Sequence, residues 1–174
     1  MTLVSRALKL AITFISTIQT CFFTRYALLT TKAGKGLRVN AKCSFGQRTI
    51  IGSDCNFNGM VVIGYGSTVI GDHFHSGPDI LVITSSHNYK SNQFIPYDDK
   101  EIVKDVIIGE YVWLGARVTL LPGTRIGDGA IVQAGSVVHG SIPACSIVGG
   151  NPAVVIGHRD AKVFEYLRLL QRAI

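Results

Sequence analysis

Acidic residues are missing from the first third of this 174-residue chain. Residues 1–53 contain eight Lys or Arg and no Asp or Glu, and charged residues make up only 16% of the whole chain. A basic segment of this kind suits an anionic partner such as a membrane surface, a nucleic acid or an acidic substrate. Nucleic acid is the weakest of the three, because the chain has no zinc-finger spacing and no RNP-like aromatic motif. We therefore expect no nucleic-acid partner.

Paired cysteines are also missing. The four cysteines include no C-x-x-C pair, which argues against a zinc ribbon and a disulfide scaffold. Cys43 and Cys55 share one phase of the repeat described below, so we expect them to be small core residues. Such thiols fit a reducing compartment and predict a cytoplasmic protein. Disorder is excluded because apolar residues make up 47% of the chain.

An unbroken apolar run is absent as well. Residues 3–29 are mostly apolar, but hydroxyl, amide and arginine side chains interrupt the roughly 20 residues that a spanning helix needs. A secretory signal is conceivable because Arg6 and Lys9 precede the run, yet no small-x-small cleavage site follows it. Residues 1–35 are therefore predicted to be helical. This segment either packs on the body of the protein or lies at the inner face of a membrane.

A six-residue period fills the middle of the chain. Glycines and small residues recur at fixed places in it, and neither an α-helix nor an alternating strand has this period. It predicts three short strands in each coil of about 18 residues, stacked into an all-β solenoid of between four and five coils. The large apolar residues at every sixth position are Val39, Phe45, Ile51, Phe57 and Ile63, and then Ile108, Leu114, Leu120, Ile126, Val132 and Val138.

The period is broken in two places. It slips once between Ile63 and Ile70, which predicts a bulged corner near residues 64–66. Residues 88–105 have no period and are polar, so we expect an extruded loop there, and long loops of this kind are usually functional.

The end of the chain leaves the repeat. Residues 158–174 are predicted to form a helix with Asp160 as its N-cap. This helix is expected to cover the open end of the solenoid with an apolar face made of Val163, Leu167, Leu170 and Ile174.

Residues 36–157 carry motifs that resemble those of the hexapeptide-repeat acetyltransferases. The similar branch holds the maltose, galactoside, nodulation and polysaccharide O-acetyltransferases. The resemblance implies a left-handed parallel β-helix that forms a homotrimer, with acetyl-CoA as acetyl donor in the cleft between neighbouring chains and no metal. The motifs include Thr84-Ser85-Ser86-His87, Val112-Trp113-Leu114-Gly115-Ala116, Ala134-Gly135-Ser136-Val137-Val138 and Gly150-Asn151-Pro152-Ala153.

The resemblance also assigns the catalytic and cofactor-binding residues. Acetyl transfer to a hydroxyl group needs a base, and histidine suits this task because it titrates near neutrality. His87 matches the catalytic histidine of the family and stands at the start of the predicted loop. Trp113, the only tryptophan, matches a tryptophan beside the pantetheine arm of the cofactor. It stands five residues after the inward Ile108, so it should point outward. The small residues matching backbone contacts to the cofactor are Gly115, Ala116, Ala134 and Gly135.

The chain departs from the family at the phosphates of CoA. His139, Gly140 and Val154 stand where the family usually has hydroxyl or basic residues. We expect Arg159 to serve instead, because it lies just beyond the last of these positions. The alternatives are Lys162, Arg117 and Arg125.

Three residues are candidates for binding the acceptor of the acetyl group. The family has an asparagine in the coil below its catalytic histidine, and Asn56 and Asn58 fit that place equally well. His75 could face the acceptor cleft. His73 and His75 also stand two residues apart beside Asp72, but no third ligand follows at metal spacing, so no metal site is expected.

These residues predict an acetyl-CoA-dependent O-acetyltransferase that acts on a sugar. A surface polysaccharide or its precursor is the favoured acceptor, because the basic and apolar N-terminal segment suits a lipid-linked substrate. Transfer to an amino sugar, serine or a drug stays open as an alternative. A non-catalytic trimeric solenoid is the alternative outside enzymes.

Overall fold

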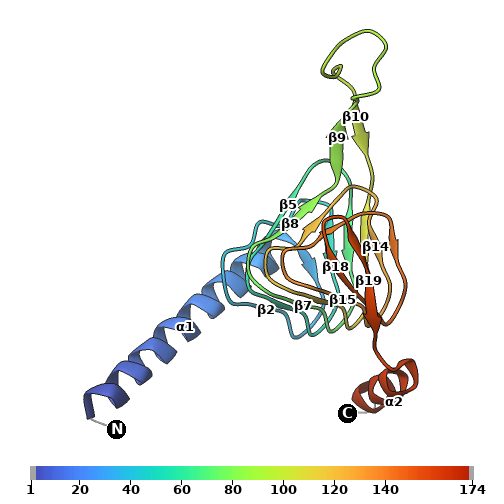
Figure 1. Ribbon diagram of the computed structural model, residues 1–174. Coiled ribbons are helices and arrows are strands. Elements are labelled where there is room, and N and C mark those ends of the chain that lie inside the picture. The colour runs from blue at the N-terminus through green and yellow to red at the C-terminus, as the bar shows by residue number, and fades with distance from the viewer. Residues whose placement is uncertain (1–2, 173–174) are drawn as a thin grey trace.

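A computed structural model describes residues 3–172 of the chain as a three-sided β-solenoid with a helix at each end of the sequence (Figure 1). The fold prediction is confirmed. One face carries six strands, so the solenoid has about six coils. This is more than the period predicts, because the first strand already begins at Lys32 and the last coil continues to Gly150.

The three faces consist of short strands that are parallel from coil to coil. The first face holds β1 (Lys32–Ala33), β3 (Thr49–Ile51), β6 (Thr68–Ile70), β11 (Val106–Ile108), β14 (Arg125–Ile126) and β17 (Ser141–Ile142). The second face holds β2 (Arg38–Val39), β4 (Asn56–Phe57), β7 (His75–Ser76), β12 (Trp113–Leu114), β15 (Ile131–Val132), β18 (Ser146–Gly150) and the antiparallel β19 (Ala153–His158). The third face holds β5 (Met60–Ile63), β8 (Ile80–Ile83), β13 (Thr119–Leu120) and β16 (Val137–Val138).

The periodic apolar residues fill the interior of the solenoid. Every member of the second series, from Ile108 to Val138, is buried, and small residues such as Thr124 and Ser136 are buried at the corners. Cys43 and Cys55 are buried as predicted, and burial raises the pKa of each thiol to about 11. Both therefore stay protonated and inert near neutral pH.

The position of the slip in the repeat was predicted wrongly. Val61 and Ile63 were expected to point inward but are 44% and 46% exposed, whereas Met60 and Val62 are buried. The turn after β4 is one residue shorter than the other turns of the repeat. Gly59 makes this possible, because its φ of 127° is one that residues with a side chain rarely adopt. The bulged corner follows at residues 64–66 as predicted. The single slip of the sequence therefore corresponds to two irregular corners, a short one at Gly59 and a long one at residues 64–66.

The predicted extruded loop leaves the solenoid after the third face. Two antiparallel strands, β9 (Ser85–His87) and β10 (Glu101–Val103), form its base. Figure 1 shows this hairpin and its loop projecting from the corner between the third and first faces. The loop therefore extends well beyond the wall of its own chain.

The C-terminal helix α2 (Ala161–Arg172) begins at the predicted cap. The Asp160 carboxylate accepts hydrogen bonds from the backbone N–H groups of Lys162 and Val163 at 2.9 and 3.0 Å. The predicted docking face is wrong, however, because Val163, Leu167 and Leu170 are exposed. Ile174, the last member of that face, lies outside the described residues.

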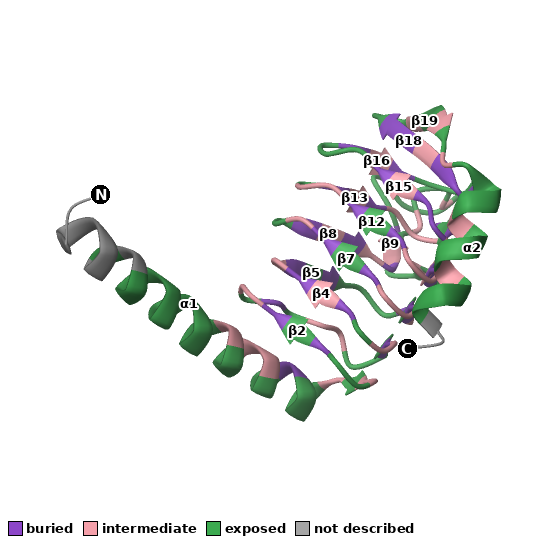
Figure 2. Cartoon of the chain, turned by 90° about the horizontal axis from the view of Figure 1, so that it is seen from below, coloured by how far each residue is buried: buried purple, intermediate pink, exposed green. Residues whose placement is uncertain are grey.

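Two other side chains attach α2 to the solenoid. The ring of Phe164 packs edge-on against Tyr111, and Arg168 forms ion pairs with Glu110 and Asp128. These partners belong to two successive coils at the corner between the first and second faces. The helix therefore runs along the side of the stack instead of covering its end (Figure 2).

The N-terminal helix α1 (Leu3–Thr30) touches the solenoid only through its C-terminal part. Ala27 is buried against the first coil, Phe23 packs on the core, and the Val39 N–H donates a 2.8 Å hydrogen bond to the Thr24 hydroxyl. The rest of the helix projects away from the body (Figure 2). Within residues 3–172, no helix combines the length and apolar character that crossing a bilayer requires.

Candidate active site

His87 stands at the end of β9, where the hairpin leaves the solenoid. Its cross-strand partner in β10 is Glu101, and 3.1 Å separates the His87 Nδ1 from a Glu101 carboxylate oxygen. A carboxylate at Nδ1 favours the tautomer that carries its proton there, which leaves Nε2 free to accept a proton. The imidazole side chain is 54% exposed. His87 therefore has the arrangement of an oriented general base that is open to an acceptor.

Tyr97 fixes the plane of the imidazole from the loop. The two rings stack with centroids 3.9 Å apart and an interplanar angle of 7°. Such a contact restricts rotation of the imidazole about its side-chain bonds. Glu101 and Tyr97 together hold His87 in one orientation.

Asp98 ties the loop together directly after Tyr97. Its carboxylate accepts hydrogen bonds from the Asn88 amide at 2.9 Å and from the Lys100 backbone N–H at 3.0 Å. Burial by itself raises the pKa of this carboxyl group, but the hydrogen bonds from Lys100 and Asn88 outweigh it and lower the pKa below its ordinary value. The charged form therefore persists at neutral pH, and the stability that it gives the loop is lost as the pH falls through that lowered pKa.

We expect Asp98→Asn to lower kcat by roughly three- to tenfold, because the loop that positions Tyr97 on His87 loses a charged anchor. Asp99→Asn is the matched control, since Asp99 is the neighbouring carboxylate and is exposed. Steady-state kinetics of both variants provide the measurement. Equal activity of the two variants would show that the Asp98 anchor does not position the base.

The outer side of the second face carries three of the predicted site residues. Asn56 pairs in register with His75, and His75 pairs with Trp113 in the next coil. The alternation of a strand places all three side chains on the outside, and Trp113 is 47% exposed as predicted. A flat wall of amide, imidazole and indole groups results, which suits a sugar ring.

The two candidate asparagines differ in how far their amides are engaged. Asn58 accepts a hydrogen bond from the Asn40 amide at 2.9 Å and donates one to the Ser76 carbonyl at 2.6 Å. Asn56 accepts from the same Asn40 amide at 2.9 Å, and within residues 3–172 no acceptor is found for its NH₂ group. Asn56 is therefore the better placed of the two to bind an acceptor.

Small residues line the corner between the second and third faces. Ala116 lies below Ala134 in successive coils, and the Gly135 N–H donates to the Ala116 carbonyl at 2.8 Å. Gly115 packs so closely that a side chain there would approach the Ala134 nitrogen to 2.5 Å. Among the residues that the structure describes, none accepts a hydrogen bond from the N–H of Ala116 or Ala134. This corner offers two unused donors, one at the half-buried Ala116 and one at the exposed Ala134, beside which a slender chain could lie.

The structure separates the predicted phosphate ligand from this corner. The Arg159 Nε donates a 2.7 Å hydrogen bond to the Gly129 carbonyl, at the corner between the first and second faces. Arg117 lies next to Ala116 instead, where it pairs with Asp79 at 3.8 Å. The role of Arg159 in binding the CoA phosphates stays a prediction. Arg159 could reach them only from the edge of the second face that lies opposite the Ala116–Ala134 corner.

One chain does not bring the base and the small-residue corner together. His87 leaves the corner between the third and first faces, whereas Ala116 and Ala134 lie at the opposite edge of the third face. A projecting hairpin and an exposed corner on the same chain fit a cleft completed by a second copy. Within the described chain, no group of three metal-ligating side chains is found.

Comparison with known proteins connects the chain to acyl transfer. Residues 105–140 match the family model described as bacterial transferase hexapeptide (six repeats). The chain is 38% identical over 144 residues to Escherichia coli K12 WbbJ, which is named as an O-acetyl transferase of lipopolysaccharide biosynthesis, and the match covers 76% of this chain and 72% of WbbJ. It is 35% identical to E. coli WcaF, named as a colanic acid biosynthesis acetyltransferase, over 68% of this chain and 59% of that protein.

A solved structure of an acetyltransferase is also similar to this chain. The hexapeptide-repeat-containing acetyltransferase VCA0836 from Vibrio cholerae, crystallised with acetyl-CoA, superimposes with a TM-score of 0.64 at 30% identity. The match covers 78% of this chain and 77% of that one.

Sequence reasoning missed Glu101 and Tyr97 as partners of His87. Both belong to the aperiodic loop, where no repeat indicates which residues face one another. The available signal was the acidic residue at the far end of the loop, since a hairpin base brings the two loop ends into register.

Proposed function

We propose that this chain, which belongs to the hexapeptide-repeat family of acyltransferases, transfers an acetyl group from acetyl-CoA to a sugar hydroxyl of a surface polysaccharide or its precursor. The observation that carries the proposal is the His87 imidazole, held by Glu101 and Tyr97 and open at Nε2. A base of this kind is what a hydroxyl nucleophile needs. The names of the relatives support a polysaccharide acceptor.

Each group of the site has one task in the reaction. The His87 Nε2 takes the hydroxyl proton while the hydroxyl oxygen attacks the thioester carbon. The unused N–H of Ala116 stabilises the negative charge that develops on the carbonyl oxygen. When the carbon–sulfur bond breaks, the imidazolium returns its proton to the departing thiolate, so the products are an acetyl ester and CoA.

The acceptor would lie against the second face. His75 and Asn56 offer polar groups to the sugar, and the Trp113 ring in the next coil lies beside them, where it would flank the pantetheine arm. This placement supports a carbohydrate over a small apolar drug, because the wall is flat and polar. Backbone groups of Gly115, Ala116, Ala134 and Gly135 would hold the pantetheine arm.

The proposed site needs a trimer. His87 of one chain and the small-residue corner of its neighbour would form each cleft, and three identical clefts close a ring. Light scattering should give about three times the chain mass of 18.8 kDa. The buried thiols Cys43 and Cys55 support a reducing compartment, in which we place the trimer as a cytoplasmic protein.

Three measurements test the proposal. The protein should be retained by immobilised CoA, and it should consume acetyl-CoA when sugars and oligosaccharides are supplied in turn. The product of a turned-over sugar should release acetate in alkali, as an ester does and an amide does not. A chain that passes through the CoA resin would be a binding module and not an acetyltransferase.

A further inference from the structure

Among the side chains that the structure describes, those of α1 before Thr20 have no covering layer. Residues 10–19 are all exposed, although most of them are apolar. The same helix becomes partly buried only from Thr20 onward, where it meets the first coil. A helix that exposes this much apolar surface is unusual in a protein surrounded by water.

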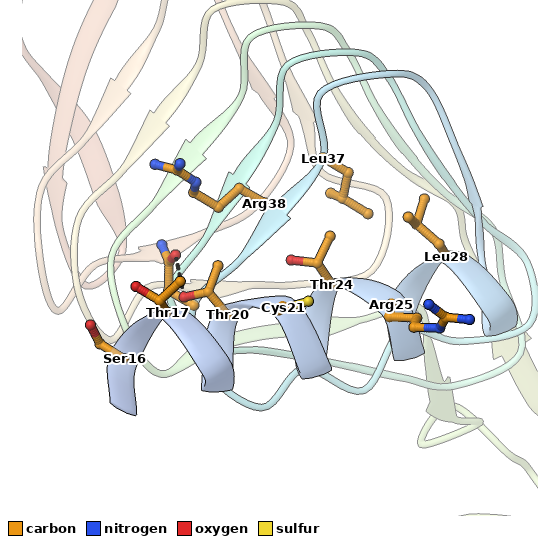
Figure 3. Close-up of a pocket in the computed structure, with 10 residues that line it drawn as sticks. Ser16, Thr17, Thr20, Cys21, Thr24, Arg25, Leu28, Leu37 and Arg38 are labelled. Atoms are coloured by element: carbon orange, nitrogen blue, oxygen red, sulfur yellow. Dashed lines mark hydrogen bonds between the residues drawn. The ribbon is translucent and has the colours of Figure 1, made fainter. Parts of the chain in front are cut away.

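The side of α1 that faces the solenoid carries threonines beside the apolar Phe23 and Ala27. Thr17, Thr20 and Thr24 recur at helical spacing and point toward β2 (Figure 3). They border an open groove of about 800 Å³ between the helix and the first coil, and Thr24 and Thr20 form hydrogen bonds to Val39 and Asn40. The polar residues that interrupt the apolar run are therefore used for attachment to the body.

Three large apolar side chains form another side of the helix. Phe14, Ile18 and Phe22 recur at intervals of four residues, so they share one side, and each is more than half exposed. At about 100° per residue this side is turned away from the threonines. The exposed apolar residues of α1 are Leu8, Leu10, Ile12, Phe14, Ile15, Ile18, Phe22, Tyr26, Leu28 and Leu29.

Basic residues lie near the C-terminal end of α1, where the helix joins the first coil. The first acid in the sequence is Asp54, so the whole helix and the first coil carry only basic charges. The basic residues of the first coil and the following turn are all exposed: Lys32, Lys35, Arg38, Lys42 and Arg48.

We propose that α1 lies in the surface of an anionic lipid bilayer, with its Phe14–Ile18–Phe22 side among the acyl chains and the basic end of the solenoid against the headgroups. An apolar face next to unopposed basic charge is the signature of such interfacial helices. The helix lies on the membrane and does not span it. This binding is separate from acetyl transfer, and it would hold the first coil at the surface.

A second copy of α1 is the other candidate to cover this side. Charge argues against it, because helix-to-helix packing would bring together segments that all carry positive charge and no acid. Arg25 also lies exposed within the helix, where its long side chain can reach headgroups. An anionic surface neutralises these charges, whereas another copy adds to them.

Flotation of the full chain with lipid vesicles tests the proposal. The protein should float with vesicles of phosphatidylglycerol and phosphatidylcholine in equal parts, float less with phosphatidylcholine alone, and detach in high salt. The double variant Phe14→Asp, Ile18→Asp should lower the vesicle partition coefficient by at least about tenfold, because it removes two apolar anchors.

The matched control is Ser16→Asp, Thr17→Asp, which adds the same charge to the side that faces the groove. It should keep most of the binding, and circular dichroism should show both variants folded. Absence of flotation by the unmodified protein, or equal binding of the two double variants, would overturn the proposal. A change in assembly mass without vesicles that is confined to the Phe14, Ile18 variant would assign the surface to a second copy instead.

Discussion

Replacing His87 by alanine is expected to lower kcat by about 10²–10⁴-fold, because the hydroxyl acceptor loses its proton acceptor. Acetyl-CoA affinity should hardly change, since backbone groups of the Ala116–Ala134 corner, and not His87, would hold the cofactor. Initial rates at saturating acetyl-CoA, together with binding of CoA by calorimetry, separate the two effects. A variant that keeps near-full turnover would remove His87 from the mechanism.

Two further substitutions distinguish the base from its neighbours. Glu101→Gln should lower kcat less than His87→Ala does, because the amide keeps the position beside Nδ1 but loses the charge that favours the imidazolium. His139→Ala should have little effect, since His139 is an exposed histidine of another coil. An equal loss in His139→Ala would mean that His139 is needed as much as His87, which the account does not allow.

Ala134→Trp is the second substitution with a large expected effect. The indole would fill the small-residue corner beside Ala116 and cover the unused N–H groups, so acetyl-CoA binding should fall by at least about a hundredfold. The fold should tolerate the change because Ala134 is exposed. Retention on immobilised CoA and the KM for acetyl-CoA provide the measurement.

Ala144→Trp is a closely matched control for this substitution. Ala144 is also exposed, and a side chain at Gly127 would approach its nitrogen to 2.5 Å, as one at Gly115 would approach the Ala134 nitrogen. It differs in lying at the corner between the first and second faces. If both tryptophans weaken CoA binding equally, the cofactor does not lie at the Ala116–Ala134 corner.

The regular part of the fold is predictable from the sequence because it repeats. A residue such as Leu114 has an equivalent in the next coil at Val132, and their common burial follows from the period alone. The outward direction of Trp113 follows in the same way. The corner at Gly59 was missed because a short turn is followed by a long turn at residues 64–66. The sequence shows only the sum of the two, which is a single shift of the six-residue period.

The partners of His87 and the packing of the two helices could not be predicted, because they depend on contacts outside the six-residue repeat. Tyr97 and Glu101 meet His87 because the loop folds back on its own base. In α2, the apolar side chain that docks is Phe164, which sits over Gly129 where a side chain would collide with the ring. In α1, threonines lie beside Phe23 and Ala27 on the side that faces the protein, while large apolar side chains elsewhere on the helix stay exposed. An amphipathic helix usually turns its apolar side inward.

The central claim is that each active site combines His87 of one chain with the Ala134 corner of another, and mixed trimers test it most directly. His87→Ala and Ala134→Trp chains are each expected to be nearly inactive as pure trimers. Co-expression in equal amounts should restore about a quarter of the wild-type rate, because random assembly leaves that share of the clefts with both halves intact. A mixture no more active than the two pure variants would contradict a site shared between chains.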